Sequence, residues 1–131
     1  MSRSGYIEDG DLDNWDMIRW RGAVTAAIRG KRGQAFLREL VAALDALPNK
    51  RLVSQELVTD DGDVCAMGAV CKVRGVDVSA IDPDDYSTVA GTMGLSEAMV
   101  REIAYENDER SLTPEKRWES MRKWAVAQLK P

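Results

Sequence analysis

Apolar residues recur at three- and four-residue spacing along most of the chain, a pattern typical of amphipathic helices. The first such stripe predicts a helix over residues 14–29 that ends at Gly30, and the second predicts a helix over residues 34–47. Because the link over residues 30–33 is short, we expect these helices to pack as an antiparallel or steeply angled hairpin.

The middle of the chain is harder to assign. Residues 51–59 fit a short strand or a helical turn, and a turn signal follows at residues 60–63. Residues 64–73 are apolar nearly all round, which predicts a buried central helix ending at Gly75, although a buried strand of that length has the same pattern.

Helix caps organise the rest of the sequence. Asp82 and Pro83 predict a helix start, with Asp as the cap, and Gly94 predicts its end. Ser96 predicts the cap of another helix that runs to about Asn107. Residues 113–115 predict the start of a last helix, whose inward stripe comprises Trp118, Met121, Ala125 and Leu129.

These elements predict a mostly α fold, a compact bundle of about five helices with at most one short strand or hairpin near residues 51–64. With 131 residues the chain has the size of one domain. We expect residues 1–13 to form a mobile acidic N-terminal tail and residues 14–131 to form a single helical domain.

Composition restricts the possible functions. The sequence contains no His, which removes the commonest general base and metal ligand, and it has no phosphate-binding or dinucleotide motif. Cys65 and Cys71 are six residues apart, unlike redox or zinc pairs, so we expect two free buried thiols. We therefore expect no enzyme, with no catalytic residue, metal or cofactor. Without a secretory signal or an 18-residue apolar run, the protein is expected in the cytoplasm, away from membranes.

Charge is segregated along the chain, although the formal net charge is only −4. Residues 17–53 carry eight basic and two acidic side chains, and residues 116–131 carry five basic and one acidic. Residues 54–115 carry four basic and fourteen acidic side chains. Such blocks either favour oriented association with a charged partner or neutralise each other within the fold.

Two charged faces are therefore candidate binding sites. A partner-binding acidic face is predicted within residues 82–109, and it comprises Asp82, Asp84, Asp85, Glu102, Glu106 and Asp108. A basic face that would bind an anion or a partner comprises Arg29, Lys31, Arg32, Arg38, Lys50 and Arg51. The alternative for the basic face is a solvated rim that pairs with the acidic half of the same chain.

Two further features weigh on function. Residues 86–103 have the layout of a helix-turn-helix, but the second helix carries mainly acids, which phosphates would repel. Trp15 and Trp20 lie five positions apart and do not share a narrow helix face, so we expect at least one of them to be exposed. An exposed Trp near Arg19 and Arg21 is a candidate interface aromatic, with a core role as the alternative.

Several segments resemble small proteins encoded by tailed phages and prophages of proteobacteria. The resemblance extends over most of the chain, and the segments that carry it most clearly are residues 20–24, 30–34, 36–40, 64–70 and 103–108. It implies a bacterial host cell, and small phage accessory proteins often inhibit host defence by binding. We therefore expect an anti-CRISPR-like inhibitor that binds a host protein or ribonucleoprotein complex. The alternative is a small nucleic-acid-binding regulator that uses the basic face or the helix-turn-helix-like element.

Overall fold

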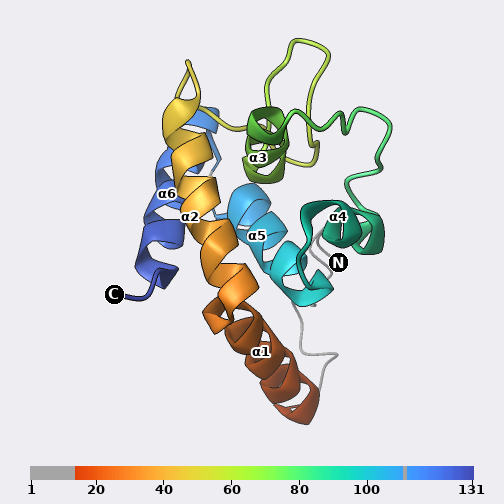
Figure 1. The fold of residues 1–131 in the computed structure, drawn as a ribbon, viewed down its shortest axis with the longest axis vertical. Coiled ribbons are helices and arrows are strands. Elements are labelled where there is room, and N and C mark those ends of the chain that lie inside the picture. The colour runs from red at the N-terminus through yellow and green to blue at the C-terminus, as the bar shows by residue number, and fades with distance from the viewer. Residues whose placement is uncertain (1–13, 111) are drawn as a thin grey trace.

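The computed structural model describes residues 14–110 and 112–131, and within them the chain forms helices joined by loops (Figure 1). The mostly α expectation is therefore confirmed. The N-terminal tail expected over residues 1–13 lies outside the described residues. The helices are α1 (Asn14–Arg29), α2 (Lys31–Ala46), α3 (Ala66–Arg74), α4 (Tyr86–Met93), α5 (Glu97–Glu109) and α6 (Pro114–Gln128).

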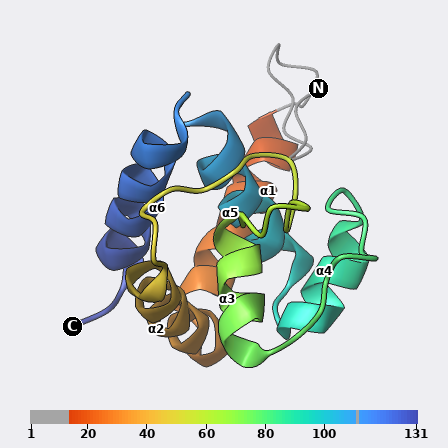
Figure 2. The same cartoon turned by 90° about the horizontal axis from the view of Figure 1, so that it is seen from above.

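The first two helices meet at a corner at Gly30. Helix α1 has the predicted bounds, but α2 begins at Lys31, three residues earlier than predicted, because extended backbone at Gly30 starts a new helix at once. A Cβ atom on Gly33 would lie 2.0 Å from the Ala27 carbonyl oxygen, so only glycine allows this close approach. The helices diverge from the corner, which is the angled one of the two predicted arrangements (Figures 1 and 2).

The segment before α3 is neither of the predicted alternatives. Residues 51–65 form a loop in which Val58 and Val64 make an isolated antiparallel bridge. Helix α3 follows with Cys65 as its N-cap, and Gly75 ends it as predicted, with a left-handed φ of 75°. Both thiols are free and buried, as expected, and burial raises the pKa of Cys71.

The predicted start at Asp82 is wrong. Helix α4 begins at Tyr86, because Asp85 accepts the Thr88 N–H at 3.2 Å and acts as the cap. Asp82 instead accepts the Asp84 N–H at 2.9 Å and closes a turn before the helix. The remaining predicted caps are confirmed: Gly94 ends α4, Ser96 caps α5 and Thr113 caps α6.

Helix α5 lies at the centre of the fold and packs against α1, α3, α4 and α6 (Figure 2). Met99, Val100 and Ile103 on this helix are all at most 2% exposed. One core of buried side chains draws on all the described helices. No helix in the described part of the chain combines the length and apolar character needed to cross a membrane.

Candidate functional site

The fold brings the two basic stretches of the sequence together. Helix α2 packs along α6, so these helices of the two basic stretches share one side of the molecule, whereas α1 packs against α5 (Figure 1). The acidic stretch, residues 54–115, supplies α3, α4, α5 and the loops around them. Charge that is segregated along the sequence is thus also segregated in space. Ion pairs occur within the basic side, as between Arg122 and Asp45, and also between the two sides, as between Arg74 and Glu39.

Exposed acid is concentrated in two loops on either side of α3, residues 54–63 and 75–85, which we call the acidic loops. Together they carry eight carboxylates and no basic side chain. Seven of the eight residues are exposed and one is half-buried. The eight residues are Glu56, Asp60, Asp61, Asp63, Asp77, Asp82, Asp84 and Asp85.

The acidic loops lie side by side. Leu57 of the first loop and Val78 and Ile81 of the second line the same small apolar cavity beside α3 and α4. Leu57 is 5% exposed and Val78 is 6% exposed, so each loop is anchored in the core by an apolar side chain. The views in Figures 1 and 2 agree on this neighbourhood. Eleven residues, 64–74, separate the loops along the sequence, and the shared core joins their surfaces.

Hydrogen bonds fix the carboxylates of the second loop. Asp77 accepts hydrogen bonds from the backbone N–H and the hydroxyl of Ser79, at 2.9 and 2.7 Å. Asp85 accepts from both the N–H and the hydroxyl of Thr88. These bonds lower the pKa of both carboxyls, because hydrogen bonding favours the ionised form. The second loop therefore holds its charge in fixed positions.

The first loop is held to the core by α5. Asn107, which is 1% exposed, donates from Nδ2 to the Val53 carbonyl at 2.9 Å. Its neighbour Asp108 accepts the Gln55 N–H at 3.0 Å, and Gln55 has a left-handed φ of 63°. Asp108, predicted in the acidic face, thus positions the first loop. Spacing along the sequence gives no signal for the role of Asn107, because its backbone partners at Ala66 and Val53 lie more than forty residues earlier.

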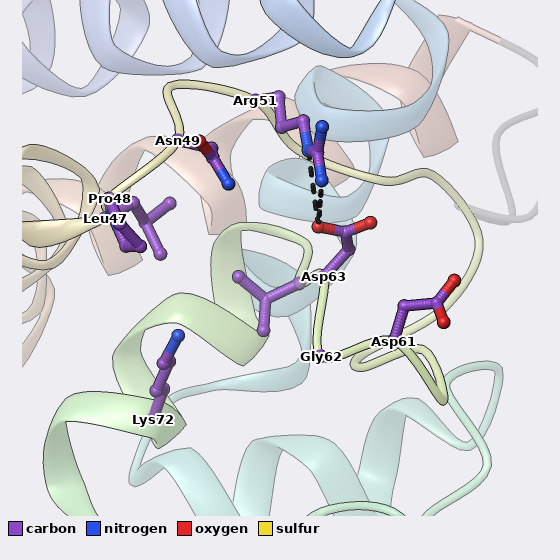
Figure 3. Close-up of a pocket in the computed structure, with 9 residues that line it drawn as sticks. Leu47, Pro48, Asn49, Arg51, Asp61, Gly62, Asp63 and Lys72 are labelled. Atoms are coloured by element: carbon purple, nitrogen blue, oxygen red, sulfur yellow. Dashed lines mark hydrogen bonds and ion pairs between the residues drawn. The ribbon is translucent and has the colours of Figure 1, made fainter.

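A polar hollow of about 210 Å³ lies at the base of the first loop (Figure 3). Arg51 pairs there with Asp63, at 3.0 Å between Nη2 and Oδ1. Figure 3 shows Lys72 on the far side of the hollow from Arg51 and the Asp61 carboxylate pointing away. Basic and acidic side chains therefore meet at this hollow, and Glu56 and Asp60, the other two acids of the first loop, do not line it.

The predicted acidic face needs a correction at α5. Glu102 is 4% exposed and Glu106 is 7% exposed, so neither contributes to an outer acidic surface. Arg21 donates to both carboxylate oxygens of Glu102, and Arg110 pairs with Glu106. Both acids lie three or four residues from the buried Met99 or Ile103, a helical spacing that places them beside the apolar stripe. Asp82, Asp84 and Asp85 remain exposed, in the second acidic loop.

The predicted basic face is divided. Arg29, Lys31 and Arg32 are exposed together at the α1–α2 corner, and Arg38 is exposed two turns along α2. Lys50 and Arg51 follow the other end of α2, about 24 Å away for a helix of this length. Lys50 is bound there to the Leu47 carbonyl and Arg51 to Asp63. All six side chains are exposed, but they do not form one continuous face.

The structure also places the candidate interface tryptophans and the helix-turn-helix segment. The side chain of Trp15 lies outside the described residues, and Trp20 is half-buried against the core. Helices α4 and α5 do form a helix-turn-helix corner, but α5 is enclosed by four helices and does not present a face that could enter a DNA groove. Within the described residues, no group of three or more His, Cys, Asp or Glu side chains is placed to hold a metal ion.

No family model matches the sequence, and comparisons with curated proteins and with solved structures find no match. The resemblance to phage proteins therefore stays a prediction.

Proposed function

We propose that this protein is a phage-encoded inhibitor that binds a host defence complex, with its acidic loops occupying a surface where that complex binds nucleic acid. One observation carries the proposal: two adjacent loops present eight carboxylates and no cation. The resemblance to small phage proteins supplies the context of host defence.

The chemistry of nucleic-acid binding supports this choice of partner surface. Double-stranded DNA carries about one negative charge per 1.7 Å, so proteins that hold it line their grooves with Lys and Arg. A protein surface that carries closely spaced carboxylates is complementary to such a groove. Because hydrogen bonds and buried apolar anchors already fix the acidic loops, little ordering is needed on binding. The basic α2–α6 side would orient the molecule as it approaches.

The proposal is tested by a tagged pull-down from a lysate of a defence-proficient bacterial host, with a parallel nuclease-treated sample. We expect a stoichiometric protein partner that survives nuclease and is released by added DNA or RNA, because both compete for the same groove. A partner that is retained in the presence of excess nucleic acid would contradict the proposal.

The exposed corner at Arg29, Lys31 and Arg32 favours a second candidate, a small nucleic-acid-binding regulator. This function predicts direct and salt-sensitive binding of DNA or RNA, weakened in the double variant Lys31→Glu/Arg32→Glu, with the salt slope falling by about one for each lost phosphate contact. Absence of binding at low salt would dismiss it.

A further inference from the structure

A second polar cavity lies away from the acidic loops, between α1, α5 and α6. Its volume is about 410 Å³, within the range of about 300–1,000 Å³ that is usual for small-molecule sites. No residue that lines it belongs to the acidic loops. The side chains that matter for recognition are Arg21, Arg29, Glu106, Arg110, Trp124 and Gln128.

Opposite charges lie at different depths in this cavity. The side chains of Glu102 and Glu106 are 5% and 9% exposed, whereas those of Arg21 and Arg110 are 49% and 57% exposed. Carboxylates therefore form the floor and guanidinium groups the rim, where Arg29 is also exposed. A ligand that matches this order carries hydrogen-bond donors at its inner end and an anion at its outer end.

The two floor carboxylates differ in how strongly they are held. Arg21 binds both oxygens of Glu102, at 2.9 and 3.1 Å. Glu106 has one ion pair among the described residues, at 3.3 Å from the Nε of Arg110. Burial raises the pKa of Glu106, and the neighbouring Glu102 raises it further. Glu106 is therefore the carboxylate that two hydrogen-bond donors on a ligand would stabilise most.

Three other polar groups around the cavity make no hydrogen bond to the described part of the chain. No hydrogen bond joins the indole N–H of Trp124, the side-chain amide of Gln128 or the guanidinium of Arg29 to another described residue. Trp124 is half-buried, so its ring offers a flat surface at the wall of the cavity. An aromatic wall beside a carboxylate and an amide suits a planar ligand that carries several donors.

We propose that this cavity binds a guanine nucleotide, with the base beside Trp124 and Glu106 and the phosphate at the arginine rim. The adjacent N1–H and 2-amino N–H groups of guanine match the two oxygens of a carboxylate. Adenine offers only an amino group on that edge, so it fits less well. The site is separate from the acidic loops and does not depend on the inhibitor proposal.

The test is isothermal titration calorimetry of the full chain with GMP, IMP, AMP and guanosine. We expect one GMP site per chain and an IMP affinity lower by at least about tenfold, because IMP lacks the 2-amino group that donates to a charged acceptor. Guanosine should also bind more weakly, because it lacks the phosphate. The 5′-phosphorylated tetranucleotide pGUUU shows whether the natural ligand is a free nucleotide or the 5′ end of a nucleic acid. Affinity equal to that of GMP indicates a nucleic-acid end, and weaker binding indicates a free nucleotide.

Variants locate the binding to this cavity. Arg29→Ala should weaken GMP about tenfold and leave guanosine unchanged, whereas the matched control Arg38→Ala, on an exposed part of α2, should leave both unchanged. Glu106→Gln should remove most of the preference for GMP over IMP. If that buried substitution prevents folding, the exposed Arg29→Ala variant still tests whether GMP binds in this cavity. The proposal is overturned by absence of saturable GMP binding, by equal affinities for GMP, IMP and AMP, or by equal effects of the two arginine variants.

Discussion

Asn107 Oδ1 accepts the backbone N–H of Ala66 at 3.0 Å, joining the central helix α5 to the first residue of α3 across forty-one positions of sequence. The same side chain donates from Nδ2 to the Val53 carbonyl and to Asp108 Oδ1. One fully buried amide thus holds both ends of the segment that contains the first acidic loop. The exposed charge on that loop depends on this buried anchor for its position.

Replacing the anchor should therefore loosen the loop. Asn107→Ala leaves the Ala66 N–H and the Val53 carbonyl without their partner, so we expect a loss of about 2–4 kcal/mol in the free energy of unfolding. Urea unfolding measures the loss, and hydrogen exchange should show faster exchange at Ala66. Asn49→Ala is the matched control, because Asn49 is exposed and its substitution should change stability by less than about 0.5 kcal/mol. Equal stability of the two variants would contradict the anchoring role.

The packing of the first acidic loop on α3 depends on Gly68. A Cβ atom at this position would lie 1.9 Å from the Leu57 carbonyl oxygen, so Gly68→Ala must displace the loop. We expect a cost of about 2–4 kcal/mol in thermal or urea unfolding. Gly91→Ala is the control, because nothing lies within 4 Å of its added Cβ in α4. Gly91→Ala should raise the free energy of unfolding by about 0.5–1 kcal/mol through helix propensity. Equal losses of stability in the two variants would contradict the role of the close contact at Gly68.

The ion pair between Arg74 and Glu39 joins α3 to α2, and its coupling free energy should depend on pH. Two nitrogens of Arg74 contact the two Glu39 oxygens at 2.7 and 2.6 Å. The hydrogen bond from Arg74 lowers the pKa of Glu39 below its ordinary value of 4.5. A carboxyl with a lowered folded-state pKa stabilises the fold above its ordinary pKa, and the contribution is lost as pH falls through the folded-state value.

A double-mutant cycle with Glu39→Gln and Arg74→Gln measures this coupling. We expect about 1 kcal/mol at neutral pH, a value reduced by the partial exposure of both side chains, and a decline toward zero as pH falls through the lowered folded-state pKa of Glu39. A coupling energy that stays constant over this pH range would contradict the assignment. Arg101 and Glu97, an ordinary pair one turn apart in α5, provide a control cycle with a smaller expected coupling of about 0.3–0.5 kcal/mol.

Local signals predicted most of the helices because they act over a few residues. Gly75, Gly94, Ser96 and Thr113 each cap or end a helix through neighbours within about four positions, so the sequence displays them directly. The start of α4 was misplaced because Asp82 carries a cap signal as good as that of Asp85, and only the folded turn decides between them.

The candidate surfaces were predicted less well, because burial depends on tertiary packing. The count of acids in residues 54–115 correctly indicated a strongly acidic region, but it could not separate exposed from buried carboxylates. Glu102 is buried because Arg21, eighty-one positions earlier, lies against it. The predicted basic face likewise treated residues at the two ends of α2 as neighbours, although a straight helix keeps them apart.

A comparison of two charge-matched variants tests whether the acidic loops bind the partner. One variant neutralises loop acids and combines Glu56→Gln, Asp60→Asn, Asp61→Asn and Asp84→Asn. The other neutralises four exposed acids elsewhere and combines Glu97→Gln, Glu109→Gln, Glu115→Gln and Glu119→Gln. Both change the net charge by the same amount and spare Asp77 and Asp85, whose carboxylates hold turns or caps.

The measurement is the dissociation constant of each folded variant for the host complex captured by the wild-type protein, at fixed moderate salt. We predict that the loop variant loses affinity at least about tenfold, whereas the control variant stays close to wild type, because only the loop charges face the partner's cationic groove. Equal affinities of the two variants would contradict binding through the acidic loops.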